Sequence, residues 1–151
     1  MMLFHFVFYL LLGLMYRMAI YIESIISGII CGIILLQTSV IAPSVFKYLN
    51  QNQTRDLLRA IFPKFFLFIF FLGLFSLIIG QINDLHFDIQ LIVSSLTIVL
   101  SIVCYFIIPA TNAAKDKNNQ NRFKILHKIS VLSTVIILIA NLSWIFLIKG
   151  L

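Results

Sequence analysis

Four long apolar runs separated by three polar intervals dominate the pattern of this chain. We expect them to form helices over Ile20–Ala42, Phe62–Gly80, Ile89–Ile108 and Ile129–Ile148. Each is close to the roughly 20 mostly apolar residues that a helix needs to cross the ~30 Å hydrocarbon core of a bilayer. The pattern predicts an all-α integral membrane four-helix bundle, with no large domain outside the membrane.

Prolines and polar residues mark the expected helix ends. Pro43 and Pro109 should end the first and third spans, because proline cannot donate a backbone hydrogen bond. Pro63 is tolerated in the first turn of the second span. Between the first two spans, Thr54 is the expected N-cap of a short interfacial helix whose Leu57, Leu58 and Ile61 share one side.

An additional apolar segment, residues 1–17, precedes the first span. It lacks the basic start and the small-residue cleavage site of a secretory signal, so we do not expect a cleaved leader. Three interpretations stay open: an extension of the first helix, sequence upstream of a true start at Met18, or a half-span lying in the membrane interface. The folded unit is expected to be one four-span domain, residues 18–151.

Composition supports the membrane class. Hydrophobic residues make up 62% of the chain and charged residues 11%, and the mean hydropathy is +1.09. The net charge of +6 lies between apolar runs, where it signals topology rather than a nucleic-acid surface. The expected partners are therefore the lipid bilayer and a membrane protein or further copies of this chain, and no nucleic acid.

The basic residues are distributed unevenly among the intervals. Nine of them lie in the first and third intervals, and only Arg17 and Lys149 lie elsewhere. Because cytoplasmic loops carry the excess of Lys and Arg, residues 47–64 and 110–128 are expected in the cytoplasm. Residues 81–88 and both termini are then outside, in what we expect to be the inner (plasma) membrane of a bacterium.

A seam of small residues lies on the first span. Ser24, Gly28 and Gly32 recur every fourth residue and therefore share one helix face, where another backbone can approach closely. We expect this helix-packing seam to serve contacts inside the bundle, with a homodimer interface as the alternative.

Several short motifs follow one another along the spans: G-x-x-x-G in the first, IAPSVF at its end, a Phe-Pro opening the second, YFIIPATN closing the third and FKILHKIS opening the fourth. In this order the chain, from about Ile20 to Leu147, resembles the transmembrane protein 205-like family, a four-span domain of unknown function. The resemblance implies an architecture but no activity. It directs attention to Pro43, Phe46, Pro109, Asn112 and His127.

The expected topology places a polar cluster at the cytoplasmic mouth. Pro43 and Asn112 close two spans, His127 opens a third, and Gln37 lies one to two turns deeper. A polar side chain inside a span is costly and needs a partner, so Gln37 and His127 are the first candidates for a site. We expect Asn112 and His127 to donate to the carbonyls that the prolines leave unpaired. The alternative is that His127 is an anchor at the headgroups.

Metal and haem sites are not favoured. The interval 81–88 holds Asp84, His86 and Asp88, but such loops usually only cap helices. His127 and the pair His5 and His86 lie at opposite depths, which disfavours haem within one subunit. Soft ligands for copper could come from Met1, Met2, His5, Met15 and Met18. Cys31 and Cys104 lack disulfide or zinc spacing. We therefore expect no metal site, no cofactor and no catalytic residue.

Function is the least constrained conclusion. Only Gln37 and Asn141 are amides well inside a span, which favours a non-catalytic accessory or partner-binding component. The first alternative is a small-solute or metal-export component in which polar faces of spans one, three and four line a path. The second is a haem- or quinone-linked redox enzyme.

The topology has a direct test. On a background with Cys31 and Cys104 replaced by alanine, a cysteine at Asp84 should react with an impermeant reagent added to intact cells, and a cysteine at Asn119 should not. Labelling at Asn119 alone would invert the orientation.

Overall fold

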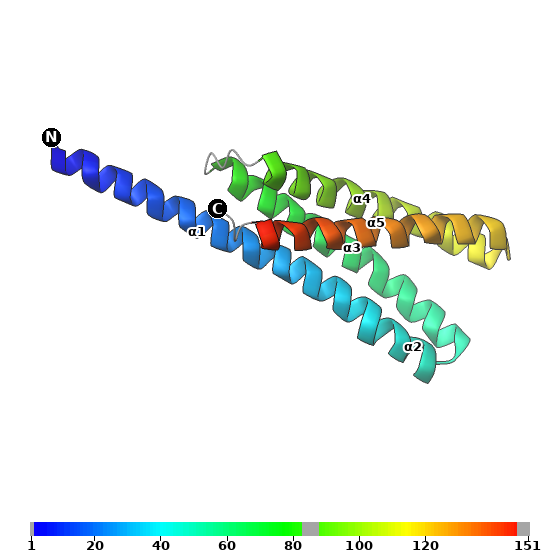
Figure 1. Ribbon diagram of the computed structural model, residues 1–151. Coiled ribbons are helices and arrows are strands. Elements are labelled where there is room, and N and C mark those ends of the chain that lie inside the picture. Colours follow the sequence, from blue (N-terminus) through cyan, green and yellow to red (C-terminus); the bar gives the residue numbers. More distant parts are fainter. Residues whose placement is uncertain (1, 83–87, 148–151) are drawn as a thin grey trace.

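The computed structural model describes residues 2–82 and 88–147. Its elements, in chain order, are α1 (Met2–Leu36), the π-helical turn η1 (Gln37–Ile41), α2 (Ala42–Tyr48), α3 (Gln51–Ile82), α4 (Asp88–Asp116) and α5 (Gln120–Leu147) (Figure 1). Four helical segments are long and apolar enough to cross a membrane, the first being His5–Tyr48, in which α1, η1 and α2 are continuous. The described residues contain no strand, which confirms the all-α membrane bundle.

Neither of the two prolines ends its span, contrary to the sequence-based expectation. Pro43 lies in the first turn of α2, and Pro109 lies inside α4. The helix adjusts locally instead. Before Pro43 the Ala42 N–H bonds to the Gln37 carbonyl in π geometry, and near Pro109 the Thr111 hydroxyl donates to the Ile107 carbonyl (3.0 Å). The π turn is a local adjustment next to Pro43, and helices in membranes tolerate proline through adjustments of this kind.

The expected interfacial helix is likewise part of a longer helix. α3 begins at Gln51 and continues through the second span without a break. Its N-cap is Asn50 rather than Thr54: the Gln53 N–H donates to Asn50 Oδ1 (3.0 Å), and the Asn50 N–H donates to Gln53 Oε1 (3.2 Å). This reciprocal pair is a capping box built on asparagine and glutamine.

α4 is the central helix of the packing. Its most extensive contacts are with α3 and α5, while α1 packs against α5 and α3. Isoleucines from three helices form the buried core, namely Ile26, Ile30, Ile34, Ile69 and Ile137. Gly73 permits the close approach of α3 to α4, because a Cβ built there would lie 3.1 Å from Thr97 Cγ2 and 3.4 Å from the Ile98 backbone nitrogen.

The N-terminal part of α1 projects away from the other helices (Figure 1). All side chains from residue 5 to residue 18 are exposed, and Ala19 is the first buried one. At ~1.5 Å per residue, the continuous helix from Met2 to Tyr48 is about 70 Å long, more than twice the hydrocarbon thickness of a bilayer. The bundle therefore covers only the second half of this helix.

Two glycine substitutions separate internal packing from external surface. Gly73→Leu should destabilise the bundle by about 1–3 kcal/mol, because the added side chain collides with α4. Gly28→Leu should leave a monomer nearly unchanged, since nothing in the described chain lies within 4 Å of a Cβ built there. Thermal unfolding in detergent, followed by size-exclusion chromatography, measures both. Equal losses would contradict this packing.

Candidate functional site

A carboxyl group is buried where three helices meet. Glu23 of α1 is 0% exposed, and the Ser76 hydroxyl of α3 donates a hydrogen bond to its Oε2. The Gln90 amide of α4 donates in turn to the Ser76 carbonyl (3.1 Å) and to Ser76 Oγ (3.4 Å). Ser76 and Gln90 are themselves buried. We call Glu23, Ser76 and Gln90 the carboxyl cluster.

A glycine makes room for this cluster. Gly80 lies one turn after Ser76 on the same face of α3. A Cβ built at Gly80 would collide with Gln90 Oε1 and would lie only 2.8 Å from Gln90 Nε2. The amide of Gln90 therefore occupies the space that any other residue at position 80 would fill.

The carboxyl of Glu23 has no positive partner among the residues that the structure describes. Their ion pairs join Arg55 to Asp56 and Arg59 to Asp116, near the other end of the bundle. Within the same residues, Glu23 Oε1 is buried without a hydrogen-bond partner. An unpaired buried carboxylate is very costly in a low-dielectric environment, so this group must be neutral or must hold a cation.

Polar side chains continue from the carboxyl cluster along one face of α4. They follow Gln90 at alternating steps of four and three residues, and all are buried: Ser94, Thr97, Ser101 and Cys104. The hydroxyls of this α4 stripe donate to carbonyls of their own helix, at 2.8 Å for Thr97 to Val93 and 2.9 Å for Ser94 to Gln90. From Gln90 to Cys104 the stripe is about 21 Å long.

α5 contributes one amide to this stripe. Asn141 Nδ2 donates to Thr97 Oγ1 (3.0 Å) and to the Ile137 carbonyl (2.9 Å), and Asn141 is 2% exposed. The thiols of Cys31 and Cys104 approach the Leu138 and Ser130 carbonyls, both at 3.8 Å. Both cysteines are free and buried, so they join helices through weak contacts rather than through a disulfide.

The residues of the predicted polar cluster lie on four different elements. Pro43 lies on α2, which continues η1 in the same helix and lies well apart from the ends of α4 and α5 (Figure 1). Asn112 is half-buried on α4. His127 is exposed on α5, where its ring stacks on Phe123 with centroids 5.6 Å apart. Gln37 is buried in η1, and its Nε2 has no partner in the described chain.

The small-residue seam faces away from the bundle. Ser24 is half-buried and donates to the Ile20 carbonyl (2.8 Å), while Gly28 and Gly32 are exposed, with open space where a Cβ would lie. At these glycines the seam therefore makes no contact inside the described bundle. This leaves the seam accessible to a helix of another chain, as the homodimer alternative requires.

Residues considered for metals lie scattered. The described residues contain no group of three His, Cys, Asp or Glu side chains that could hold a metal ion. His5 is exposed on the projecting part of α1. Asp84, His86 and Met1 lie outside the described residues.

Sequence reasoning missed the carboxyl cluster. Glu23 is visible in the sequence as the one acidic residue within an apolar run, yet the sequence analysis gave it no role. Gln90 was not counted among the amides inside a span. The partners come from three helices, so only the packing brings them together. The available signal was the charge itself, since an ionisable residue inside a span points to a site.

Substitutions of Asn141 and His127 should differ in their effect on the stability of the bundle. Asn141→Ala should destabilise the bundle by about 0.6–1.7 kcal/mol, the range measured for hydrogen bonds between membrane helices. His127→Ala should change stability by less than about 0.5 kcal/mol, because the ring is exposed. Thermal unfolding of both variants in one detergent decides this. A larger loss at His127 would support the site predicted from sequence.

Comparison with known proteins identifies a family but no characterised relative. No curated protein and no solved structure matches the chain significantly. A family model described as a domain of unknown function (DUF4149) matches residues 25–120, more than half of the chain. The matched region contains Ser76 and Gln90 and begins two residues after Glu23. The chain thus belongs to the DUF4149 family of domains of unknown function.

Proposed function

We propose that this membrane protein is a non-catalytic transport component that binds and moves a proton through Glu23. The observation that carries the proposal is a fully buried carboxyl with polar partners from α3 and α4 and no basic partner among the described residues. Intramembrane carboxyls of this kind mark ion pathways and proton relays.

A proton suits this site better than a divalent metal. One carboxyl, one hydroxyl and one amide supply a single negative charge at most, and a proton alone neutralises it. The described residues lack the cluster of three ligands that a transition metal would require. Binding a proton also leaves Ser76 and Gln90 free to keep their present hydrogen bonds. This favours proton movement over metal export.

The α4 stripe supplies the continuation of a path. Its buried hydroxyls begin one turn from Gln90, and the whole stripe, from the Gln90 amide to the Cys104 thiol, is about two-thirds as long as the ~30 Å hydrocarbon core is thick. Serine and threonine hydroxyls can both donate and accept, so a proton can pass along them when their bonds reorient. In the present arrangement these hydroxyls donate to carbonyls of their own helix and not to one another. We take this arrangement as the resting state of the path, in which no proton moves.

A second candidate function is binding to another membrane protein, as a non-catalytic accessory. It is favoured by the uncovered face of α1, where residues 5–18 are exposed and Gly28 and Gly32 leave room for a close helix. The two functions are compatible, because they use different faces of α1.

The likeness to the transmembrane protein 205-like family is also kept as a proposal. It rests on the order of the short motifs around Pro43, Pro109 and His127, and it carries no activity to transfer. The outward orientation of the termini is kept as a proposal that rests on charge distribution. The inner-membrane location is kept as a proposal too.

Proton movement is testable in liposomes. Liposomes containing the purified protein and an internal pH dye, with a membrane potential set by potassium and valinomycin, should change internal pH faster than empty liposomes. Glu23→Gln should reduce the rate to that of empty liposomes, because the amide fills the same space but cannot carry a proton.

Asp116→Asn is the matched control, since it makes the same chemical change on an exposed carboxyl at the other end of α4. It should retain the flux of the unmodified protein. Equal rates for Glu23→Gln and the unmodified protein would refute the proposal, as would unmodified protein no faster than empty liposomes.

A further inference from the structure

The turn between α4 and α5 has a compact geometry fixed by two asparagines. Asn118 has a positive φ of 53°, the left-handed conformation that asparagine tolerates at a helix end. The Asn119 N–H bonds to the Ala114 carbonyl (2.9 Å) and the Asn118 N–H to the Lys115 carbonyl (3.1 Å), which is a Schellman motif. Asn119 Oδ1 then accepts from the Arg122 N–H (3.1 Å) and caps α5.

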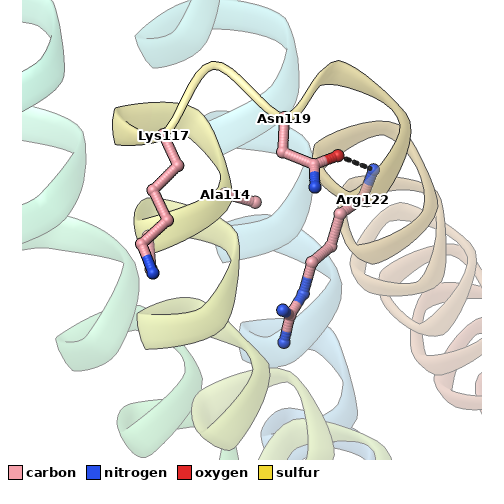
Figure 2. Close-up of a pocket in the computed structure, with 5 residues that line it drawn as sticks. Ala114, Lys117, Asn119 and Arg122 are labelled. Atoms are coloured by element: carbon pink, nitrogen blue, oxygen red, sulfur yellow. Dashed lines mark hydrogen bonds between the residues drawn. The ribbon is translucent and has the colours of Figure 1, made fainter.

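A cavity of about 230 Å³, open to the surface, lies beside this turn. Its lining consists of Ala113, Ala114, Lys117, Asn119 and Arg122. Figure 2 shows Lys117, from the turn after α4, and Arg122, from the first turn of α5, on either side of the small side chain of Ala114. The cavity is smaller than the ~300–1,000 Å³ of sites for drug-sized molecules, and it suits a compact group such as a phosphate.

The charge around the cavity is positive and largely uncompensated. Lys115, Lys124 and Lys128 lie in the same interval, whose one acidic residue is Asp116. Asp116 forms an ion pair with Arg59 of α3, so it is engaged outside the cavity lining. Arginine can bind phosphate oxygens through two parallel hydrogen bonds, and lysine adds a point charge.

The surface next to the cavity is apolar. Ile125 and Ile129 follow Arg122 at three and seven residues, so they share its face of α5, and they are 61% and 40% exposed. An anion with hydrocarbon chains could place its headgroup in the cavity and its chains along these isoleucines. A free phosphate would use only the cavity and would make no contact with the isoleucines.

We propose that the α4–α5 turn binds the phosphate headgroup of an anionic phospholipid between Lys117 and Arg122, with the acyl chains along Ile125 and Ile129. Basic pockets between membrane helices are typical sites for acidic headgroups. This site is independent of Glu23 and of the proposed proton movement, because it lies at the opposite end of α4.

The test uses the full chain in micelles of a neutral detergent, titrated with fluorescent phosphatidylglycerol and followed by polarisation. The double variant Lys117→Gln/Arg122→Gln should bind about 30-fold more weakly, as expected for two charges at a membrane surface. The matched control Lys47→Gln/Lys64→Gln loses the same charge from the other basic interval and should bind within about threefold of the unmodified protein.

Three results would overturn the proposal: an equal loss in the control pair, equal binding of phosphatidylcholine, or displacement of the lipid by inorganic phosphate as effectively as by unlabelled phosphatidylglycerol. The last result would assign the cavity to a free anion. Should the double variant not fold, Arg122→Lys keeps the charge but loses two-point binding, and an intermediate loss of affinity is expected. Unchanged affinity in that variant would argue against a headgroup held by Arg122.

Discussion

Every polar group inside a bilayer must find its partner within the protein, and this constraint governs the arrangement of the whole bundle. The hydroxyls on α4 meet it by donating to their own helix, which allows α3 and α5 to pack closely on both sides. Gly73 and Gly80 remove the side chains that would prevent that approach. The carboxyl of Glu23 does not meet it fully, because one of its oxygens is left without a partner in the described chain, as is the Nε2 of Gln37.

Hydropathy was enough to predict the number of spans and the all-helical class, because each run has the length that a bilayer requires. Helix ends were harder to predict. Pro43 and Pro109 were expected to stop helices, yet in hydrocarbon an interrupted helix leaves more unpaired groups than a helix that continues through a proline. Thr54 failed as an N-cap because Asn50 and Gln53 form a reciprocal pair that begins the helix earlier.

The predicted polar cluster illustrates a different difficulty. Pro43, Asn112 and His127 were expected at one depth, but equal depth does not make residues neighbours. α2, which carries Pro43, lies apart from the α4–α5 end (Figure 1). Conversely, the spacing of Glu23, Ser76 and Gln90 along the chain gives no hint that they meet, since their contacts depend on how three helices are rotated about their axes.

The π turn at Gln37–Ile41 has an effect on the long first helix that its sequence does not reveal. A π turn accommodates one residue more than an α-helical turn, and one residue corresponds to a rotation of about 100° around the helix axis. The residues after the turn are therefore rotated around the helix axis relative to the positions that a continuous α-helix would give them. A helical wheel drawn continuously from Glu23 to Tyr48 would assign the residues of α2 to the wrong faces, and the removal of a single residue within the turn would return the two halves to one phase.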